Sequence, residues 1–349
     1  MAGRGGCCVT IKDIARLSGC GVATVSRVLN QHPDVSEETR RKVMAVIEEY
    51  GFQPNNNAKH LKQRGGNGII ILVKGTQNML FADLVERVQT RLQENNREAV
   101  VYYLDEDADE VGYALQLCRE RKPVGILFLG GDVEMFGVEF YGISVPCVLL
   151  TNTAAELEFE NLSSFTTDDG EAAAQVIAYL AERGHRRIGV LGGNRLSSQI
   201  SCRRLEGCER TFRRLGLPFD QDRQCEPCRY SMGEAYAATL RLLSRCPDLT
   251  AIFAMSDVMA MGTIRALRDL GKRVPEDISV VGFDGISMAR YSVPRLTTVR
   301  QDTQRLAERG VDVLLHNIER KNHPVHEVVP FQLIAGESVA QLEAARSAV

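Results

Sequence analysis

The chain has 349 residues, of which 44% are hydrophobic and 25% are charged, and this balance excludes a disordered or fibrous protein. The formal net charge is −3, but residues 1–65 hold ten Lys or Arg against six Asp or Glu, a net charge of +4. A small basic head on an acidic body predicts that only the head meets a polyanion.

Targeting and redox features point to the cytoplasm. No apolar run reaches the roughly 18–20 residues that a membrane span requires. The first 13 residues lack the apolar segment of a secretory signal. The ten cysteines are scattered and show no small-domain disulfide pattern, so we expect reduced thiols.

The first 50 residues predict three short helices. The first begins at Thr10, a residue suited to helix capping, and Gly19–Gly21 ends it. The second spans about Val22–Asn30, and the third begins at Ser36 and ends near Gly51. Two amphipathic helices joined by a short glycine-containing turn are typical of a helix-turn-helix. A small three-helix bundle without a DNA partner is the alternative.

The two faces of the second helix carry different chemistry. Apolar side chains at helical spacing predict a buried face, Val25, Val28 and Leu29, and Val43 continues the apolar stripe in the third helix. The opposite face carries groups that hydrogen-bond to phosphates and base edges: Thr24, Ser26, Arg27 and Asn30. Arg27 can present two donors to one guanine, which favours DNA binding over a merely solvated face.

A basic segment with little apolar surface follows, from Pro54 to Arg64, and the glycine cluster at 65–68 ends it. An isolated helix of this composition is marginal in water. The segment is therefore interpreted as a hinge that becomes ordered on binding.

From Ile69 the pattern changes to apolar strands that alternate with helices. We expect strands at Ile69–Val73, Ala99–Leu104, Gly125–Leu129, Cys147–Leu150, Ile188–Gly192, Ala251–Ala254 and Ser279–Phe283. We expect helices at Phe81–Asn95, Val111–Glu120, Gly170–Arg183, Arg203–Leu215, Met232–Ser244 and Val258–Leu270. This α/β pattern predicts two subdomains, each a doubly wound parallel sheet, with ligands at the carboxyl ends of the strands.

Collinear motifs between about residues 9 and 338 resemble the lactose/galactose repressor (LacI/GalR) family. The matching segments are Thr10–Ala15, Ala23–Asn30, Val35–Ser36, Thr39–Arg40, Gly51–Asn55, Gly184–Ile188, Ser256–Gly262, Pro275–Asp284 and Leu296–Asp302. The resemblance implies a periplasmic-binding-protein-like core, a small all-α helix-turn-helix head and a hinge helix. It also implies a dimeric, cytoplasmic transcription regulator, here a repressor.

The resemblance assigns DNA contacts by position. It implies base reading by Val22, Ala23 and Arg27, phosphate contacts by Thr24, Ser26 and Asn30, and hinge contacts by Asn55, Ala58, Lys59 and Leu61. Leu61 matches the hinge leucine that wedges into the minor groove, where partial unstacking bends the duplex. The residue pair Val22 and Ala23 resembles the pair found at these positions in the galactose-repressor subgroup. Small apolar side chains suit contact with a thymine methyl. Gly21 stands where the family has a capping serine.

The resemblance also implies an effector site between the two subdomains. The matching positions are Asn78, Phe81, Asp169, Arg203, Ser256, Asp284 and Gln301. A guanidinium at Arg203 and a carboxylate at Asp284 would span adjacent hydroxyls of a sugar ring. Ser256 stands where Asn is usual, and Met79–Leu80 replaces a common Pro-Phe. The expected partners are a near-palindromic operator duplex, a sugar or sugar derivative, and a second copy of the chain.

The predicted boundaries follow the same pattern. They are 1–53 for the head, 54–66 for the hinge, 67–340 for the core and 341–349 for a tail too short for a tetramerisation helix. Within the core, we assign about 67–184 and 303–325 to an N-subdomain and about 185–300 and 326–340 to a C-subdomain.

Two other classes of protein share features of this sequence. A sugar-binding receptor would share the core but lack the head. An enzyme on a doubly wound sheet needs a catalytic constellation, and we find none. Cys225 and Cys228 could form half a metal site or a redox pair, but no second ligand pair and no nearby His accompany them, so two free thiols are expected. We therefore expect no catalytic residue, cofactor or metal.

Overall fold

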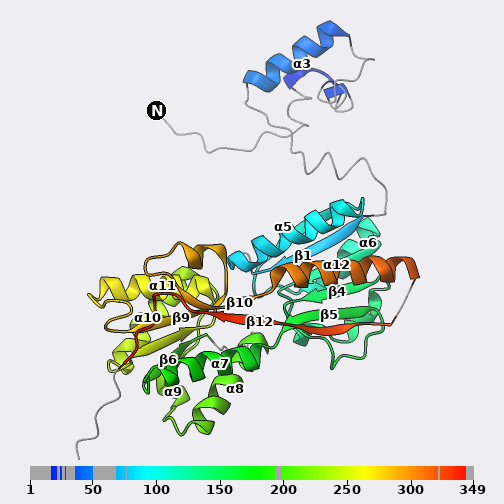
Figure 1. Cartoon of the computed structure of the whole chain (residues 1–349). Helices are drawn as coiled ribbons and strands as arrows, with labels where there is room; N and C mark the ends of the chain where they lie inside the picture. Colours follow the sequence, from blue (N-terminus) through cyan, green and yellow to red (C-terminus); the bar gives the residue numbers. More distant parts are fainter. Residues whose placement is uncertain are drawn as a thin grey trace, which may run out of the picture. The chain divides into compact units, whose positions relative to one another are not determined.

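The computed structural model describes residues 17–21, 24–25, 28, 36–49, 68–75, 77–192, 199–320 and 323–342. The chain consists of two units, Met1–Gly65 and Gly66–Val349, which Figure 1 draws in sequence colours. Within the described ranges, no helix has the length and apolar character needed to cross a membrane.

The N-terminal unit contains the helix α3 (Glu37–Glu49). The hydroxyl of Ser36 accepts a hydrogen bond from the backbone N–H of Thr39 at 3.3 Å, which confirms Ser36 as the residue that caps this helix. Val25, Val28 and Val43 are at most 2% exposed, so these three predicted core positions are confirmed. Most of the first two predicted helices and the whole hinge segment lie outside the described residues.

The second unit contains two six-stranded sheets, whose core strands were predicted closely. The first sheet has the order β11-β5-β4-β3-β1-β2, and all of its strands are parallel. Its strands are β1 (Ile69–Lys74), β2 (Ala99–Leu104), β3 (Gly125–Leu129), β4 (Cys147–Leu150), β5 (Leu162–Thr167) and β11 (His326–Val329). The second sheet has the order β12-β10-β9-β8-β6-β7, with only β12 antiparallel to its neighbour. Its strands are β6 (Ile188–Leu191), β7 (Cys225–Glu226), β8 (Ala251–Ala254), β9 (Ser279–Asp284), β10 (Thr297–Gln301) and β12 (Phe331–Ile334).

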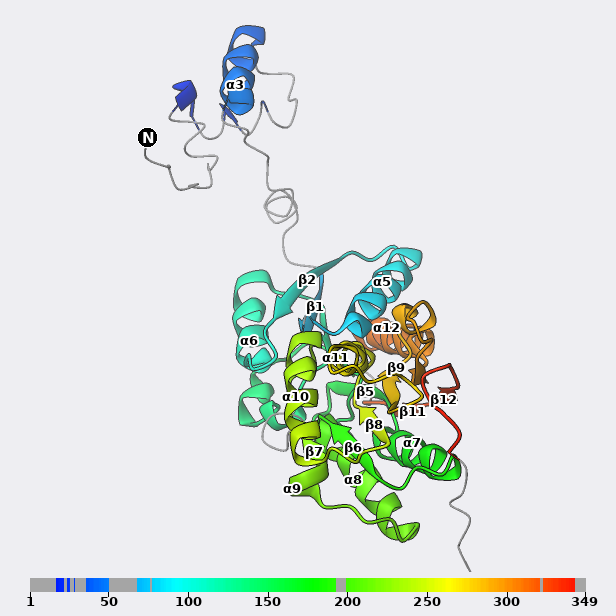
Figure 2. The same ribbon diagram turned by 90° about the vertical axis from the view of Figure 1, so that its left-hand side faces the viewer.

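Helices cover both faces of each sheet, as parallel strands require. The main helices are α5 (Met79–Glu94), α6 (Glu110–Arg121), α7 (Asp169–Glu182), α8 (Gln199–Arg214), α10 (Met232–Arg245), α11 (Asp257–Asp269) and α12 (Thr303–Arg320). The first sheet packs against α5 and α12 on one face and α6 on the other, and α5 and α12 lie side by side in Figures 1 and 2. The second sheet packs against α7 and α8 on one face and α10 and α11 on the other.

Within the described residues, the chain crosses between the two sheets three times, and each crossing is a single residue long. Asp168 separates β5 from α7, Asp302 separates β10 from α12, and Pro330 separates β11 from β12. Three such short links confine the relative motion of the two subdomains to a few backbone torsions, as in a hinge.

These crossings correct two of the predicted subdomain boundaries. The segment up to residue 184 was assigned to the N-subdomain, but α7 packs its buried alanines against β6, β8 and α8 of the second sheet. The segment 326–340 was assigned to the C-subdomain, but β11 pairs with β5 in the first sheet. Both errors arise because the chain crosses before α7 and again before β12. No glycine or proline run marks the first crossing in the sequence, and Pro330 alone marks the second.

The contact between α7 and α8 depends on two glycines. A Cβ atom at Gly207 would overlap the carbonyl of Gly170, so the two helices touch through backbone atoms. We predict that Gly207→Ala destabilises the core by roughly 1–3 kcal/mol, as overpacking does. Gly233→Ala is the matched control, because a Cβ atom there meets nothing within 4 Å. Chemical denaturation of both variants measures the effect, and equal stability would contradict this packing.

Candidate functional site

A cavity of about 350 Å³ lies at the carboxyl ends of strands from both sheets. This is where doubly wound sheets bind ligands. Its floor and walls come from loops that follow β1, β2, β3 and β4 of the first sheet and β7, β9 and β10 of the second. The polar and charged lining residues are Lys74, Gln77, Asn78, Asp105, Glu106, Asp132, Thr151, Asn152, Arg204, Arg229, Tyr230, Ser231, Glu234, Asp284 and Gln301.

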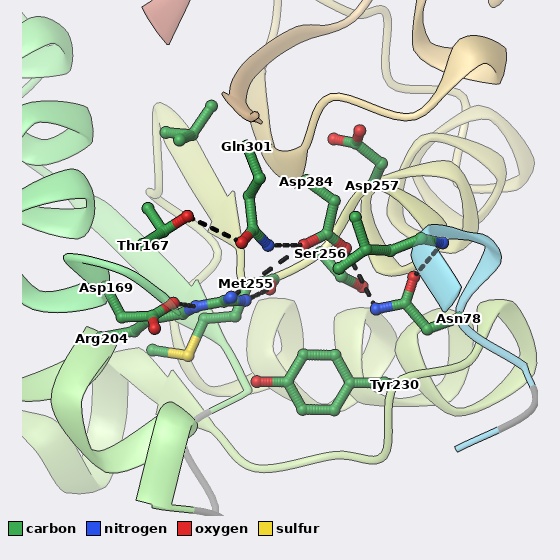
Figure 3. A network of polar contacts seen from close by, with 12 residues as sticks. Asn78, Thr167, Asp169, Arg204, Tyr230, Met255, Ser256, Asp257, Asp284 and Gln301 are labelled. Atoms are coloured by element: carbon green, nitrogen blue, oxygen red, sulfur yellow. Dashed lines mark hydrogen bonds and ion pairs between the residues drawn. The ribbon is translucent and has the colours of Figure 1, made fainter. Parts of the chain in front are cut away.

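The buried carboxylate of Asp284, at the end of β9, is the centre of a network that joins the two subdomains (Figure 3). Its Oδ2 atom accepts a hydrogen bond of 3.1 Å from Nδ2 of Asn78, which belongs to the first subdomain. Its Oδ1 atom accepts one of 2.9 Å from Nε2 of Gln301. Gln301 in turn accepts from the hydroxyl of Thr167, at the end of β5. Side chains next to two of the three crossings are thus tied to one carboxylate.

Local structure fixes Asn78 in place. Asn78 is the N-cap of α5, and its Oδ1 atom accepts from the backbone N–H of Leu80 at 3.0 Å. This leaves the amide nitrogen free to reach across to Asp284. One side chain therefore starts a helix of the first subdomain and contacts the second.

Arg204, on α8, supplies the positive charge beneath the network. Its Nε donates to Asp169 at 2.8 Å, and its Nη2 lies 4.0 Å from Asp284. The guanidinium also donates to the carbonyl of Met255 and stacks 3.6 Å above the ring of Phe283. It is almost fully buried, so its charge acts in a low-dielectric setting.

Burial raises the pKa of the Asp284 carboxyl to about 6, although Arg204 and the hydrogen bonds from Gln301 and Asn78 favour the charged form. The residue also has φ +115°, an unusual backbone conformation for a side chain other than glycine. Such a strained, partly compensated carboxylate is typical of a ligand site.

The structure brings together four of the seven predicted effector residues. Asn78, Phe81, Asp284 and Gln301 line the cavity. Asp169 lies behind it, where burial raises the pKa of its carboxyl and Arg204 opposes that rise. Ser256 does not line the cavity; it is fully buried and caps α11 by accepting from the N–H of Met259.

Arg203 requires a correction, because it does not line the cavity. It is one-third exposed and its nearest acidic partner is Glu156 at 3.9 Å. Arg204 occupies the predicted place. The spacing of Leu205, Cys208 and Phe212 marks the buried face of α8, and Arg204 lies on that face, one turn before Cys208.

Sequence reasoning missed a second buried ion pair at the cavity. Lys74, the last residue of β1, lies 2.6 Å from Glu110, and their side chains are 6% and 1% exposed. Tyr230 was also missed; its hydroxyl shares a hydrogen bond of 2.7 Å with Ser201, and burial raises its pKa to about 12. A lysine ending a wholly apolar strand was the available signal.

Of the predicted DNA contacts, only Thr24 is among the described residues. It is helical and partly exposed, and its backbone N–H donates to the carbonyl of Gly21 at 2.9 Å. The other nine lie outside the described residues: Val22, Ala23, Ser26, Arg27, Asn30, Asn55, Ala58, Lys59 and Leu61.

Replacing each of the two neighbouring arginines by methionine separates their roles. We predict that Arg204→Met costs roughly 3–5 kcal/mol, because it leaves buried carboxylates without their cation. Arg203→Met removes the same charge from the same helix and should change stability by less than about 0.5 kcal/mol. Urea denaturation of the two variants tests this, and an equal loss in both would contradict the assignment of Arg204.

The raised pKa of Asp284 predicts a pH-dependent stability. The folded state binds this proton more tightly than the unfolded chain, whose carboxyl has a pKa of 3.8. The stability contributed by Asp284 is therefore fully present below about pH 4 and is lost as the pH rises through 6, by roughly 3 kcal/mol. The measurement is the free energy of unfolding of the wild type minus that of Asp284→Asn between pH 4 and 8. A difference that stays constant or grows with pH would refute it.

Comparisons with known proteins cover nearly the whole chain. A family model described as bacterial regulatory proteins, lacI family, matches residues 10–55, and one described as a periplasmic binding protein-like domain matches 177–339. The HTH-type transcriptional regulator MalR of Clostridium butyricum is 36% identical over 334 residues, or 95% of this chain and 99% of its own. The ribose operon repressor of Haemophilus influenzae is 30% identical and covers 92% and 95%.

Solved structures agree with this. A complex of the regulator CelR with cellobiose has a TM-score of 0.69 at 27% identity, covering 95% of this chain and 99% of that one. The lac repressor dimer bound to operator and the anti-inducer ONPF has a TM-score of 0.68 at 25% identity, with the same coverage. These likenesses confirm the predicted fold class of a helix-turn-helix head and a periplasmic-binding-protein-like core. The chain belongs to the lacI family of bacterial regulatory proteins and is a DNA-binding transcriptional regulator.

Proposed function

We propose that this regulator is a repressor whose affinity for its operator is controlled by a small sugar-like ligand in the cavity between the two core subdomains. The observation that carries the proposal is the hydrogen bond from Asn78 to Asp284, which crosses the cavity from one subdomain to the other. A ligand that inserts there changes the contact that holds the subdomains together.

The chemistry of the cavity suits a polyhydroxylated ring. A carboxylate accepts from ring hydroxyls, and a guanidinium fork and two carboxamides donate to ring oxygens, so adjacent hydroxyls can be held together. Asp284, Arg204, Asn78 and Gln301 supply these groups, with Phe81 as an apolar wall. Asp169 and Ser256 act from behind, by holding Arg204 and starting α11. The CelR complex with cellobiose supports a sugar as the ligand class.

Control of DNA binding follows from a change in the angle between subdomains. The single-residue crossings let one subdomain rotate against the other, and the ligand favours one of the two arrangements. In a homodimer, this rotation alters the spacing of the hinge segments and therefore their order on DNA. A coupling free energy of about 1–3 kcal/mol gives roughly 5- to 150-fold control of operator affinity.

The domain limits proposed for DNA binding are 1–53 for the head and 54–66 for the hinge. Two heads read the half-sites of a near-palindromic duplex, with base contacts by Val22, Ala23 and Arg27. Thr24, Ser26 and Asn30 contact phosphates, and Asn55, Ala58, Lys59 and Leu61 contact the central minor groove. We propose that the recognition helix belongs to the galactose-repressor-like subgroup, and the pair Val22 and Ala23 supports this. We propose no catalytic activity for this chain, and we propose that it acts in the cytoplasm, where its DNA target is.

Arg27 provides the test of sequence reading. An operator is first selected from random duplexes with the full chain. We predict that Arg27→Ala loses roughly 1–3 kcal/mol of binding to that operator and leaves binding to scrambled DNA nearly unchanged. Fluorescence anisotropy on the two duplexes measures both affinities.

Arg41→Ala is the matched control, because it removes the same charge from an exposed position of α3. It should weaken operator and scrambled duplex by similar factors. A wild-type chain with no preference for any selected sequence would overturn the proposed function, and uniform weakening by Arg27→Ala would overturn the role of Arg27.

A further inference from the structure

In the part of the chain that the structure describes, three basic side chains line the cavity: Lys74, Arg204 and Arg229. By themselves they would favour an anionic ligand, such as a phosphorylated sugar or a sugar acid. Whether they can bind an anion depends on whether their charges are already neutralised by the protein.

Each of the three is paired with a carboxylate. Lys74 lies 2.6 Å from Glu110, and Arg204 lies 2.8 Å from Asp169; all four side chains are at most 6% exposed. Arg229 donates to Asp107 and also lies 4.0 Å from Asp105.

The Lys74 pair is further fixed by the backbone. Glu110 also accepts a hydrogen bond of 2.7 Å from the N–H of Asp132, so its two carboxylate oxygens are both engaged. An incoming phosphate would have to separate buried, hydrogen-bonded partners, and breaking such a pair is costly.

Three lining carboxylates have no basic partner within 4 Å among the described residues: Glu106, Asp132 and Glu234. Asp132 accepts from the backbone N–H of Glu134, as a helix cap. Burial raises the pKa of Glu106 despite the opposing influence of Arg229. Glu234 is exposed at the rim, in the first turn of α10.

Among the described residues, the lining therefore holds five acidic side chains, Asp105 and Asp284 included, against three basic ones. Glu110 and Asp169 lie directly behind two of these bases and add further negative charge. A dianionic group would meet a negative potential in a site where charges are weakly screened. Sugar hydroxyls, by contrast, donate well to carboxylates.

Thr151 adds an independent observation for a ligand that forms hydrogen bonds in this cavity. It lines the cavity at the end of β4, is 4% exposed, and has φ +73°. Its hydroxyl is the one buried side-chain oxygen or nitrogen in the described ranges that has no hydrogen-bond partner. A hydroxyl left unpaired at a binding cavity can donate to or accept from a ligand hydroxyl, so the charge selectivity rests on the carboxylates.

We propose that this cavity selects an uncharged, polyhydroxylated sugar and rejects phosphorylated or carboxylated sugars, with Glu106, Asp132 and Glu234 as the residues that exclude anions. The inference rests on the proposed effector site. It predicts that the regulator senses a sugar before phosphorylation or after removal of the phosphate.

The test compares matched sugars on the full chain. The probes are ribose and ribose 5-phosphate, glucose and glucose 6-phosphate, and cellobiose and cellobiose 6′-phosphate, together with inorganic phosphate. Melting temperature reports binding. We expect an uncharged member to stabilise the chain, its phosphorylated partner to bind at least 100-fold more weakly, and inorganic phosphate to act no more strongly than chloride at equal ionic strength.

Variants assign the selectivity to the three carboxylates. Glu106→Gln, Asp132→Asn and Glu234→Gln combined should reduce the discrimination to 10-fold or less and make inorganic phosphate stabilising. The control combines Glu139→Gln, Glu158→Gln and Glu160→Gln, which are exposed, lie outside the cavity and change the net charge equally. Glu234→Gln alone, at the exposed rim, should shift the ratio in the same direction if the triple variant does not fold.

Several outcomes would overturn the proposal. One is a wild-type chain that binds a phosphorylated sugar or inorganic phosphate as tightly as an uncharged sugar. Others are a folded triple variant that gains no phosphate binding and a control variant that gains as much. Loss of operator preference would instead count against the proposed repressor function, and the charge selectivity would be unaffected.

Discussion

The arrangement of the two subdomains depends on one buried carboxylate, Asp284, whose hydrogen bonds come from both of them. Asp284 receives one hydrogen bond from Asn78 of the first subdomain and one from Gln301 beside a crossing, with Arg204 at 4.0 Å. Burial keeps the pKa of this group near 6, so these contacts compensate the desolvation of the charge only in part. An arrangement of the subdomains that removes Asn78 leaves a buried acceptor unsatisfied. Subdomain geometry and the state of one carboxylate are therefore coupled.

Because of this coupling, a ligand bound in the cavity can change the arrangement of the two subdomains. The Thr167–Gln301 hydrogen bond joins the ends of β5 and β10, directly beside the crossings at Asp168 and Asp302. A ligand that replaces or reinforces a contact of Asp284 acts on the same network that fixes those crossings. The coupling needs no long path through the core, because the ligand-binding groups lie next to the crossings at Asp168 and Asp302.

The sequence predicts the apolar core strands closely and misses β5, β7, β10, β11 and β12, of which β5 and β10 carry hydroxyl side chains. β3, β4 and β8 were predicted with their observed limits, since continuous apolar runs mark strands that are buried on both faces. β5 contains Ser and Thr at four of its six positions, and all six are buried. Their hydroxyls find partners elsewhere in the fold: Ser163 accepts from the N–H of Val325, and Thr167 donates to Gln301. Local hydropathy does not show such tertiary compensation.

The candidate site shows the same limit in a sharper form. Residue types at motif positions identified Asp284 and Gln301, but the choice between Arg203 and Arg204 depends on which face of α8 is buried. Charge counting also fails here, because Lys74 and Arg204 look available for an anion until their partners Glu110 and Asp169 are placed beside them. Those partners are 36 and 35 residues away in sequence. The charge that a ligand meets depends on which side chains form ion pairs in the folded structure. In this cavity, ion pairing leaves carboxylates without a basic partner among the described residues.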